Sequence, residues 1–187
     1  NGFINEARKY KVDDRGAGMN ASAIDFNEDG WWDLYLTMID TFNKQLRFEL
    51  PTSNSLVNIT DEILNTTTYI TGNKLFINRK THFTPEEHNH FDPQDMGWSW
   101  GVSFFDYDND TDKDFIIMNG IKNRNFGGNQ KNQFYWNHNN KLYLKNHPIL
   151  SKKGNSRTVT SADFDNDGKL DLLITHFDSP PQLLKNT

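Results

Sequence analysis

The chain of 187 residues contains no cysteine and no long apolar segment. Without cysteine it can form no disulfide, use no thiol in catalysis and offer no thiolate to zinc. No apolar run approaches the roughly 20 residues that a membrane-spanning helix requires, so we expect no membrane span. Because disulfides are the feature that would report the redox environment, their absence leaves the cellular compartment open.

Positive charge is also scarce, with 20 Lys and Arg against 25 Asp and Glu and a net charge of −5. The sequence has no basic stripe of the kind that nucleic-acid binders use. The Gly-rich segment 123–130 lacks the lysine and the spacing of a phosphate-binding loop, and no dinucleotide fingerprint is present. We therefore expect no nucleic-acid partner.

A nine-residue acidic motif occurs three times, at residues 25–33 (loop 1), 106–114 (loop 2) and 163–171 (loop 3). In each copy, side chains that carry oxygen occupy positions 1, 3, 5 and 9, and apolar runs lie on both sides. Carboxylates this close repel one another, so a folded chain that keeps them together must neutralise them. The alternative is a set of solvated acidic turns, because Asp, Asn and Gly favour turns without a metal. Three copies in one register favour the metal.

The donor atoms of the loops predict calcium. Calcium takes six to eight oxygen ligands, whereas zinc prefers Cys or His, which are absent from all three loops, and magnesium tends to keep its waters. We expect up to three Ca²⁺ ions, one per loop, held by the side chains at positions 1, 3, 5 and 9 and by the backbone carbonyl at position 7. The predicted ligands are Asp25, Asn27, Asp29, Trp31 and Asp33 in loop 1, Asp106, Asp108, Asp110, Asp112 and Asp114 in loop 2, and Asp163, Asp165, Asp167, Lys169 and Asp171 in loop 3.

Position 12 of the motif excludes an EF-hand, which needs a bidentate Glu there. The chain instead has Leu36, Ile117 and Ile174. Short apolar runs rich in β-branched and aromatic residues flank each loop and predict strands, so each loop should be the bend of a β-hairpin. In loop 2, Thr111 replaces the glycine of the other loops at position 6, which is expected to cost about 1 kcal/mol of backbone strain.

A second motif, which is typical of a short amphipathic strand that ends in Asn, recurs at residues 73–78, 140–146 and 182–186. The alternation of loop and strand predicts a repeating unit of about four strands. The loops start 81 and 57 residues apart, which exceeds the roughly 40–50 residues of a compact propeller blade and indicates insertions. The longest insertion, residues 40–72, is expected to be functional or disordered, with a short helix at 56–64.

Together these motifs resemble FG-GAP/VCBS repeats, the blades of calcium-binding β-propellers in integrin α subunits and in many secreted bacterial proteins. The resemblance rests on the acidic loop, on Gly-Val-Ser-Phe-Phe-Asp-Tyr-Asp at 101–108 and on the Asn-x-Leu-Tyr strand. Residues 97–101 and 180–186 are further similar to bacterial repeat proteins that often precede an ASPIC/UnbV module. The resemblance implies an all-β fold of about three four-stranded antiparallel blades, a portion of a propeller of about seven blades.

The resemblance also implies one repeat region over the whole chain. In each blade the acidic loop should link the two inner strands and the strand that ends in Asn should be the third, and the last blade stops before its outer strand. Its approximate blades are residues 12–96, 97–150 and 151–187, with 1–11 as the outer strand of a preceding blade. Because the chain begins at Asn1, with neither Met nor a signal peptide, we expect that processing or truncation has removed the true start. Other blades or partner chains should then cover its edges.

Weak multi-carboxylate sites suit a compartment with near-millimolar calcium, which predicts an extracellular, secreted, cell-surface or periplasmic location. The expected function is a rigid scaffold that binds a protein or glycan, as in cell adhesion. A structural subunit of a bacterial surface or secretion assembly is another hypothesis. Trp31 and Trp32 suit stacking on sugar rings, although one of them should face the core if both lie in a strand.

An enzymatic hypothesis remains open beside the scaffold. His88 and His90 are candidate acid and base residues of a polysaccharide lyase or hydrolase, close in sequence to Trp98 and Trp100. The structural alternative for this segment is a polar surface turn in front of core tryptophans.

Overall fold

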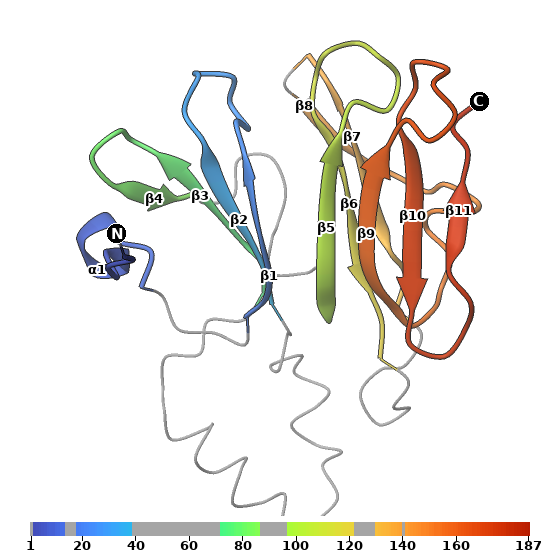
Figure 1. Cartoon of the computed structure of the whole chain (residues 1–187), viewed down its shortest axis with the longest axis horizontal. Helices are drawn as coiled ribbons and strands as arrows, with labels where there is room; N and C mark the ends of the chain where they lie inside the picture. The colour runs from blue at the N-terminus through green and yellow to red at the C-terminus, as the bar shows by residue number, and fades with distance from the viewer. Residues whose placement is uncertain (1, 14–17, 39–71, 87–96, 122–129, 140) are drawn as a thin grey trace, which may run out of the picture.

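The computed structural model of the chain describes residues 2–13, 18–38, 72–86, 97–121, 130–139 and 141–187. Within them lie a one-turn helix, α1 (Ala7–Tyr10), and eleven strands in three antiparallel sheets (Figure 1). The predicted all-β fold is confirmed. Nearly all of the 40–72 insertion, including the helix predicted at 56–64, lies outside the described residues. The described part contains no helix with the length and apolarity needed to span a bilayer.

Each sheet is a meander in which strands adjacent in sequence are paired. Sheet 1 contains β1 (Gly18–Ile24), β2 (Asp33–Met38), β3 (Lys74–Asn78) and β4 (Phe83–Pro85). Sheet 2 contains β5 (Ser99–Phe105), β6 (Asp114–Asn119), β7 (Gln133–His138) and β8 (Lys141–Lys145). Sheet 3 contains β9 (Ser156–Ala162), β10 (Asp171–His176) and β11 (Gln182–Leu184).

The three acidic loops connect the first two strands of the three sheets, as predicted. In each hairpin the last residue before the loop pairs with position 9 of the loop. These pairs are Ile24 with Asp33, Phe105 with Asp114 and Ala162 with Asp171. All three loops lie at the same end of the sheets (Figure 1). The loops are thus three equivalent hairpin bends between strands, as the exclusion of an EF-hand required.

The sheets stack face to face, and sheet 2 lies in the middle. Its strand β6 is covered on both faces, which explains why residues 115–118 are all apolar and all fully buried. Alternate side chains of this run pack with Tyr35 and Leu75 of sheet 1 and with Leu172 and Ile174 of sheet 3. Two apolar clusters, one between each pair of neighbouring sheets, therefore form the core.

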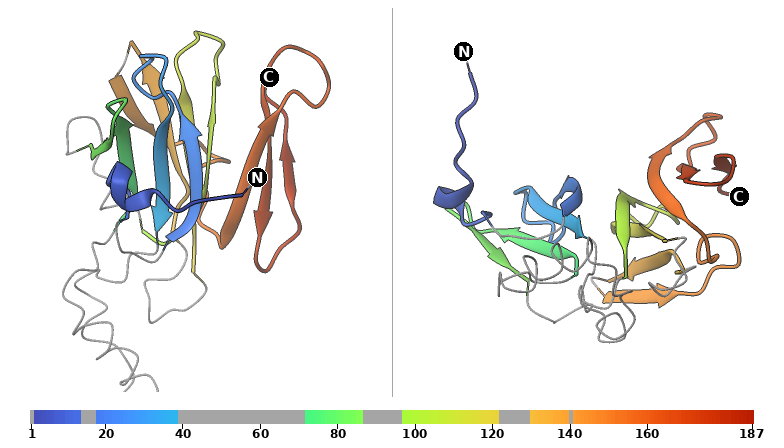
Figure 2. Two further views of the ribbon diagram at one scale, coloured as in Figure 1. Left: turned by 60° about the vertical axis from the view of Figure 1, so that its left-hand side comes forward. Right: turned by 90° about the horizontal axis from the view of Figure 1, so that it is seen from below.

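The first strands of the three sheets, β1, β5 and β9, lie next to one another (Figures 1 and 2). Between β5 and β9, the hydroxyl of Ser103 lies 3.2 Å from that of Ser161. A Cβ atom at Gly101 would lie 2.8 Å from the carbonyl oxygen of Arg157, so glycine permits this close approach. Such a row of first strands is the arrangement that the inner strands of adjacent propeller blades adopt.

A buried polar chain joins sheets 1 and 2 at the end opposite the loops. The amide of Asn73 donates to the hydroxyl of Ser99 at 3.0 Å, and this hydroxyl donates to Asn119 Oδ1 at 2.8 Å. The amide of Asn119 in turn donates to the carbonyl of Lys131 at 3.0 Å. Because the side chains of Asn73, Ser99 and Asn119 are buried, these hydrogen bonds fix the spacing between sheets 1 and 2 at this end.

Two sequence-based assignments were wrong. Residues 1–11, expected to be an outer strand, contain α1 in their described part and no strand. Residues 140–146 were expected to form the third strand of sheet 2, but 141–145 form the fourth, β8. The third is β7, because its residues pair with β6 and its Asn137 reaches Asp114. Both strands are amphipathic and followed closely by Asn, so the local pattern did not separate them.

We expect Gly101→Ala to reduce the free energy of unfolding by roughly 1–3 kcal/mol, because the new methyl group would push β9 away from β5. Gly18→Ala in β1 is the matched control, since a Cβ atom there meets nothing within 4 Å; it should change stability by less than about 0.5 kcal/mol. Urea denaturation of both variants measures the difference. Equal stability of the two would contradict this view of the interface between sheets 2 and 3.

Candidate metal-binding loops

The three loops share one backbone conformation. Position 4 is left-handed in each, with φ of 58° at Glu28, 59° at Asn109 and 59° at Asn166. Position 6 is also left-handed, with φ of 85° at Gly30, 79° at Thr111 and 87° at Gly168. Two left-handed residues make the bend tight enough to bring alternate side chains toward one another.

Hydrogen bonds to the position 1 carboxylate close each bend. In loop 1, Asp25 accepts the N–H groups of Asp29 at 3.0 Å and Gly30 at 2.8 Å. The equivalent bonds measure 3.1 and 2.9 Å in both other loops. The position 5 carboxylate accepts the N–H of position 7 at 2.9–3.0 Å in all three. The carboxylates at positions 1 and 5 are therefore oriented by the backbone of their own loop.

The carboxylate at position 9 connects each loop to the third strand of its sheet. These residues, Asp33, Asp114 and Asp171, are 0%, 0% and 3% exposed. One oxygen accepts the N–H of position 2 at 2.6–3.1 Å. The other accepts the N–H of an asparagine at 2.7–2.8 Å, namely Asn78, Asn137 or Asn186. From the sequence, Asn78 and Asn186 were recognisable only as the residues that end the recurrent strand, and this fixed place was the signal of their role.

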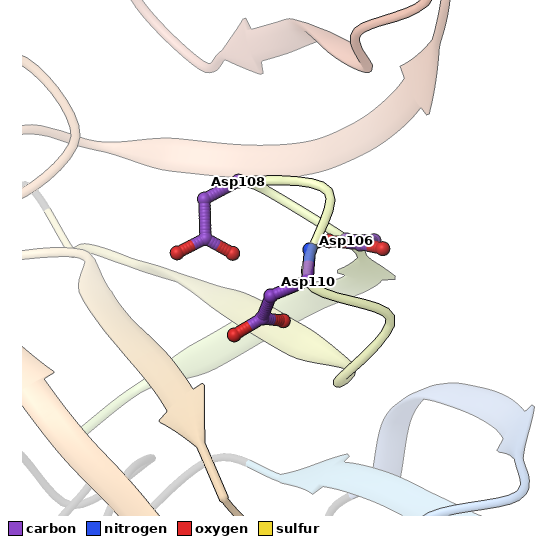
Figure 3. Close-up of side chains that lie close together, drawn as sticks. All are labelled: Asp106, Asp108 and Asp110. Carbon is purple, nitrogen blue, oxygen red and sulfur yellow. Dashed lines mark hydrogen bonds between the residues drawn. The ribbon is translucent and has the colours of Figure 1, made fainter.

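The acidic side chains converge into clusters of oxygen atoms. One carboxylate oxygen from each member lies within 4.8 Å of the others in two groups: Asp106, Asp108 and Asp110 of loop 2, and Asp163, Asp165 and Asp171 of loop 3. Figure 3 shows the loop 2 group. Ligands about 2.3–2.6 Å from one calcium ion lie at most about 5 Å apart, so this spacing and the all-oxygen donor set fit calcium. Loop 1 offers the amide of Asn27 at position 3.

The predicted position 7 ligands, Trp31, Asp112 and Lys169, each direct their N–H group to the position 5 carboxylate. Coordination through their carbonyl groups stays a prediction. The side chain of Asp112 accepts the N–H of Asn139 at 2.7 Å. The additional acid of loop 2 thus supports the turn between β7 and β8.

Each of loops 2 and 3 contacts the third strand through a side chain that sequence reasoning missed. Trp136 of β7 donates its indole N–H to Asp108 at 2.9 Å. Next to β11, the ammonium group of Lys185 bonds to Asp165 and lies 3.1 Å from Asp167. The hydrogen bond from Lys185 to Asp167 holds the pKa of the Asp167 carboxyl below its usual value. Both donors immediately precede the strand-end asparagine, but no local spacing relates them to a loop about 20–30 residues away.

Burial dominates the electrostatics of Asp114 and Asp33. It raises the pKa of Asp114 from 3.8 to about 7, although two backbone N–H groups favour the charged form. The charges of Asp108 and Asp110 raise it further. Burial raises the pKa of Asp33 in the same way. A cation beside loop 2 would favour the charged form of Asp114.

The remaining candidate residues are the tryptophans and histidines considered for sugar binding or catalysis. Trp31 and Trp32 precede β2 and are 43% and 66% exposed, so the two do not lie in a strand and the condition for one of them to face the core is not met. Trp100 donates its indole N–H to the carbonyl of Gly120 at 2.6 Å and stacks under Arg157 at 4.1 Å, which gives it a structural use between sheets 2 and 3. His88 and His90 lie outside the described residues.

Residues 124–174 match an FG-GAP-like repeat. The matched range includes β7 and β8 of sheet 2, β9 and loop 3, and most of β10. It therefore covers the outer half of one sheet and the inner half of the next, and it suggests a β-propeller-like scaffold. No curated protein matches the chain. The FG-GAP part of the resemblance is supported, while the VCBS and ASPIC/UnbV parts stay expectations.

We expect Thr111→Gly to stabilise the protein by about 1 kcal/mol, because Thr111 is an exposed β-branched residue in the left-handed region. The reciprocal change, Gly168→Ala, should destabilise by a similar amount although a Cβ atom there meets nothing within 4 Å. Urea denaturation in calcium-free buffer checks both. Opposite signs of the two stability changes support an origin in the left-handed backbone conformation of position 6. A loss of stability in Thr111→Gly would refute that origin.

The raised pKa of Asp114 predicts a pH dependence of the calcium-free protein. The folded protein binds the proton of the Asp114 carboxyl more tightly than the unfolded chain does, so this proton stabilises the folded state. Its contribution to stability is complete below pH about 4 and is lost as pH rises through about 7. The free energy of unfolding measured by urea should therefore fall between pH 5 and pH 8. Asp114→Asn should be less stable than the wild-type protein at pH 5, but its free energy of unfolding should change less between pH 5 and pH 8. An equally steep fall of the free energy of unfolding in the variant would assign the pH dependence to other groups.

Proposed function

We propose that this chain is part of a calcium-stabilised β-propeller-like scaffold that works in the extracellular or periplasmic space and binds a protein or glycan partner. The observation that carries the proposal is the threefold repetition of one network. Three loops with the same backbone, with acids at positions 1, 5 and 9 and with the same hydrogen bonds to these acids lie at one end of three adjacent sheets.

Calcium is the cation that this network suits best. When bound, it would neutralise each acidic cluster and cross-link the two strands of the hairpin. The backbone of the chain helps to arrange the oxygen atoms, since its N–H groups orient the carboxylates at positions 1, 5 and 9. Little ordering of the loop would then oppose binding, which favours occupancy at modest calcium concentrations.

The proposed location follows from the expected affinity. Loops of this kind outside the cell bind calcium with dissociation constants of about 10⁻⁴–10⁻³ M. Such sites fill where free calcium is near millimolar and stay largely empty at cytosolic levels. A scaffold that depends on them would therefore gain stability on reaching the extracellular or periplasmic space.

Two exposed tryptophans favour a binding role at the loop end. Trp31 and Trp32 are loop 1 residues at positions 7 and 8, and the ammonium group of Lys80 lies 5.5 Å from the centre of the Trp31 ring. Exposed aromatic rings beside a polar rim are the groups on which protein and sugar partners most often pack. Calcium in loop 1 would hold these rings in place, which links the ion to partner binding.

Thermal unfolding during a calcium titration tests the proposal. Occupancy of three loops at millimolar calcium should add about 1–4 kcal/mol, which corresponds to a rise of roughly 2–15 °C in melting temperature. The combined change of the position 1 residues, Asp25→Asn, Asp106→Asn and Asp163→Asn, should abolish this rise. Asp13→Asn, which removes an exposed acid outside the loops, should preserve it.

Circular dichroism of the calcium-free proteins shows whether the triple variant retains its sheets. A wild-type melting temperature that does not respond to calcium would refute the proposal, whatever the variants do. Magnesium at the same concentration should have a much smaller effect, because it dehydrates reluctantly and prefers octahedral geometry.

A further inference from the structure

The three loops differ in the residue that immediately precedes the strand-end asparagine. This residue is Ile77 in sheet 1, Trp136 in sheet 2 and Lys185 in sheet 3. Trp136 and Lys185 both bond to the acid at position 3 of their loop. Where the strand offers Ile77, which has no donor, position 3 is the neutral Asn27. A side chain that can donate a hydrogen bond therefore precedes the asparagine where position 3 is an acid, and an apolar side chain precedes it where position 3 is the neutral Asn27.

Lys185 brings a positive charge to loop 3. Its ammonium group bonds to Asp165 at position 3 and lies 3.1 Å from Asp167 at position 5. Both acids are predicted calcium ligands, so the ammonium group contacts oxygen atoms that an ion would need. Among the described residues, the acids of loop 3 bond to a lysine, whereas those of loop 2 bond to the indole of Trp136 and the imidazole of His138.

The backbone fixes this placement. On one side of Lys185, Leu184 pairs with Leu172 of β10, and on the other the N–H of Asn186 bonds to the buried carboxylate of Asp171. The Lys185 side chain is 54% exposed, and it is presented to the loop from a backbone that is held at both neighbours.

We infer that Lys185 acts as a built-in competitor for calcium, which makes loop 3 the weakest of the three calcium sites and the one that tolerates the absence of the ion best. The inference rests on the proposed function. An ion entering loop 3 must displace the ammonium group from Asp165 and Asp167, whereas loops 1 and 2 require no such step from a lysine of the described chain. Because exposed ion pairs are individually weak, the expected loss of affinity is modest, roughly 3–10-fold.

Backbone amide signals allow each loop to be followed separately by NMR. The N–H groups of Gly30, Thr111 and Gly168 occupy position 6, and each donates to the position 1 carboxylate of its own loop. Their shifts during a calcium titration report the three occupancies independently. In the wild-type protein, Gly168 should respond at the highest calcium concentration.

Lys185→Met removes the charge and keeps an unbranched side chain. It should raise the calcium affinity reported by Gly168 roughly 3–10-fold and leave Gly30 and Thr111 within about twofold of wild type. It should also lower the stability of the calcium-free protein slightly. Lys185→Arg should keep the wild-type affinity order. Lys169→Met, which removes the same charge from loop 3 without removing the contact to Asp165, should have a smaller effect.

The outcomes separate this inference from the proposed function. If none of the three amides responds to calcium, both fail. If Gly30 and Thr111 respond while Lys185→Met leaves Gly168 unchanged, the inference fails and the scaffold proposal stands. An equal gain in Lys169→Met and Lys185→Met would also overturn it, because net charge rather than occupation of the oxygens would then set the affinity.

Discussion

A buried carboxylate bonded from two sides holds each sheet of this protein together at the loop end. Asp33, Asp114 and Asp171 each accept one N–H group from the loop and one from the third strand. A buried charge of this kind is tolerated only when hydrogen bonds or an opposite charge compensate for lost hydration. Two N–H groups compensate in part, which is why the pKa of Asp114 remains raised. At Asp33 and Asp114, where burial raises the pKa, the demand for a proton or a cation is thus a consequence of how the hairpin is attached to its sheet.

Packing between sheets then determines how neighbouring loops meet. Because β6 is buried on both faces and Gly101 allows β9 to approach β5, loops 2 and 3 come into contact. The side chain of Asn109 lies 3.3 Å from the carbonyl of Gly168, and that of Asn186 donates to the carbonyl of Tyr107 at 2.8 Å. Asn186 therefore donates its backbone N–H to the buried carboxylate of its own sheet and its side-chain amide to loop 2.

The sequence was sufficient for the features that depend on local spacing. The hairpins, the shared register of the loops and the strained Thr111 followed from residue types at fixed positions within nine residues. The third strand of sheet 2 was misassigned because 133–138 and 140–146 have similar patterns, and only pairing with β6 distinguishes them. The bond between Trp136 and Asp108 was also beyond prediction, since it depends on how two strands are placed side by side. Trp32 is exposed because β2 begins one residue after it.

Stability in this fold has two sources with different dependence on ions. The apolar clusters on both sides of sheet 2 and the buried chain from Asn73 to Asn119 require no metal. The tips of the hairpins concentrate negative charge that the backbone orients but does not neutralise. In the proposed scaffold, calcium would therefore act on the loops more than on the stacking of the sheets. Loss of the ion should loosen the loop end first, where Trp31 and Trp32 are exposed, while the opposite end stays ordered by packing and by its own hydrogen bonds.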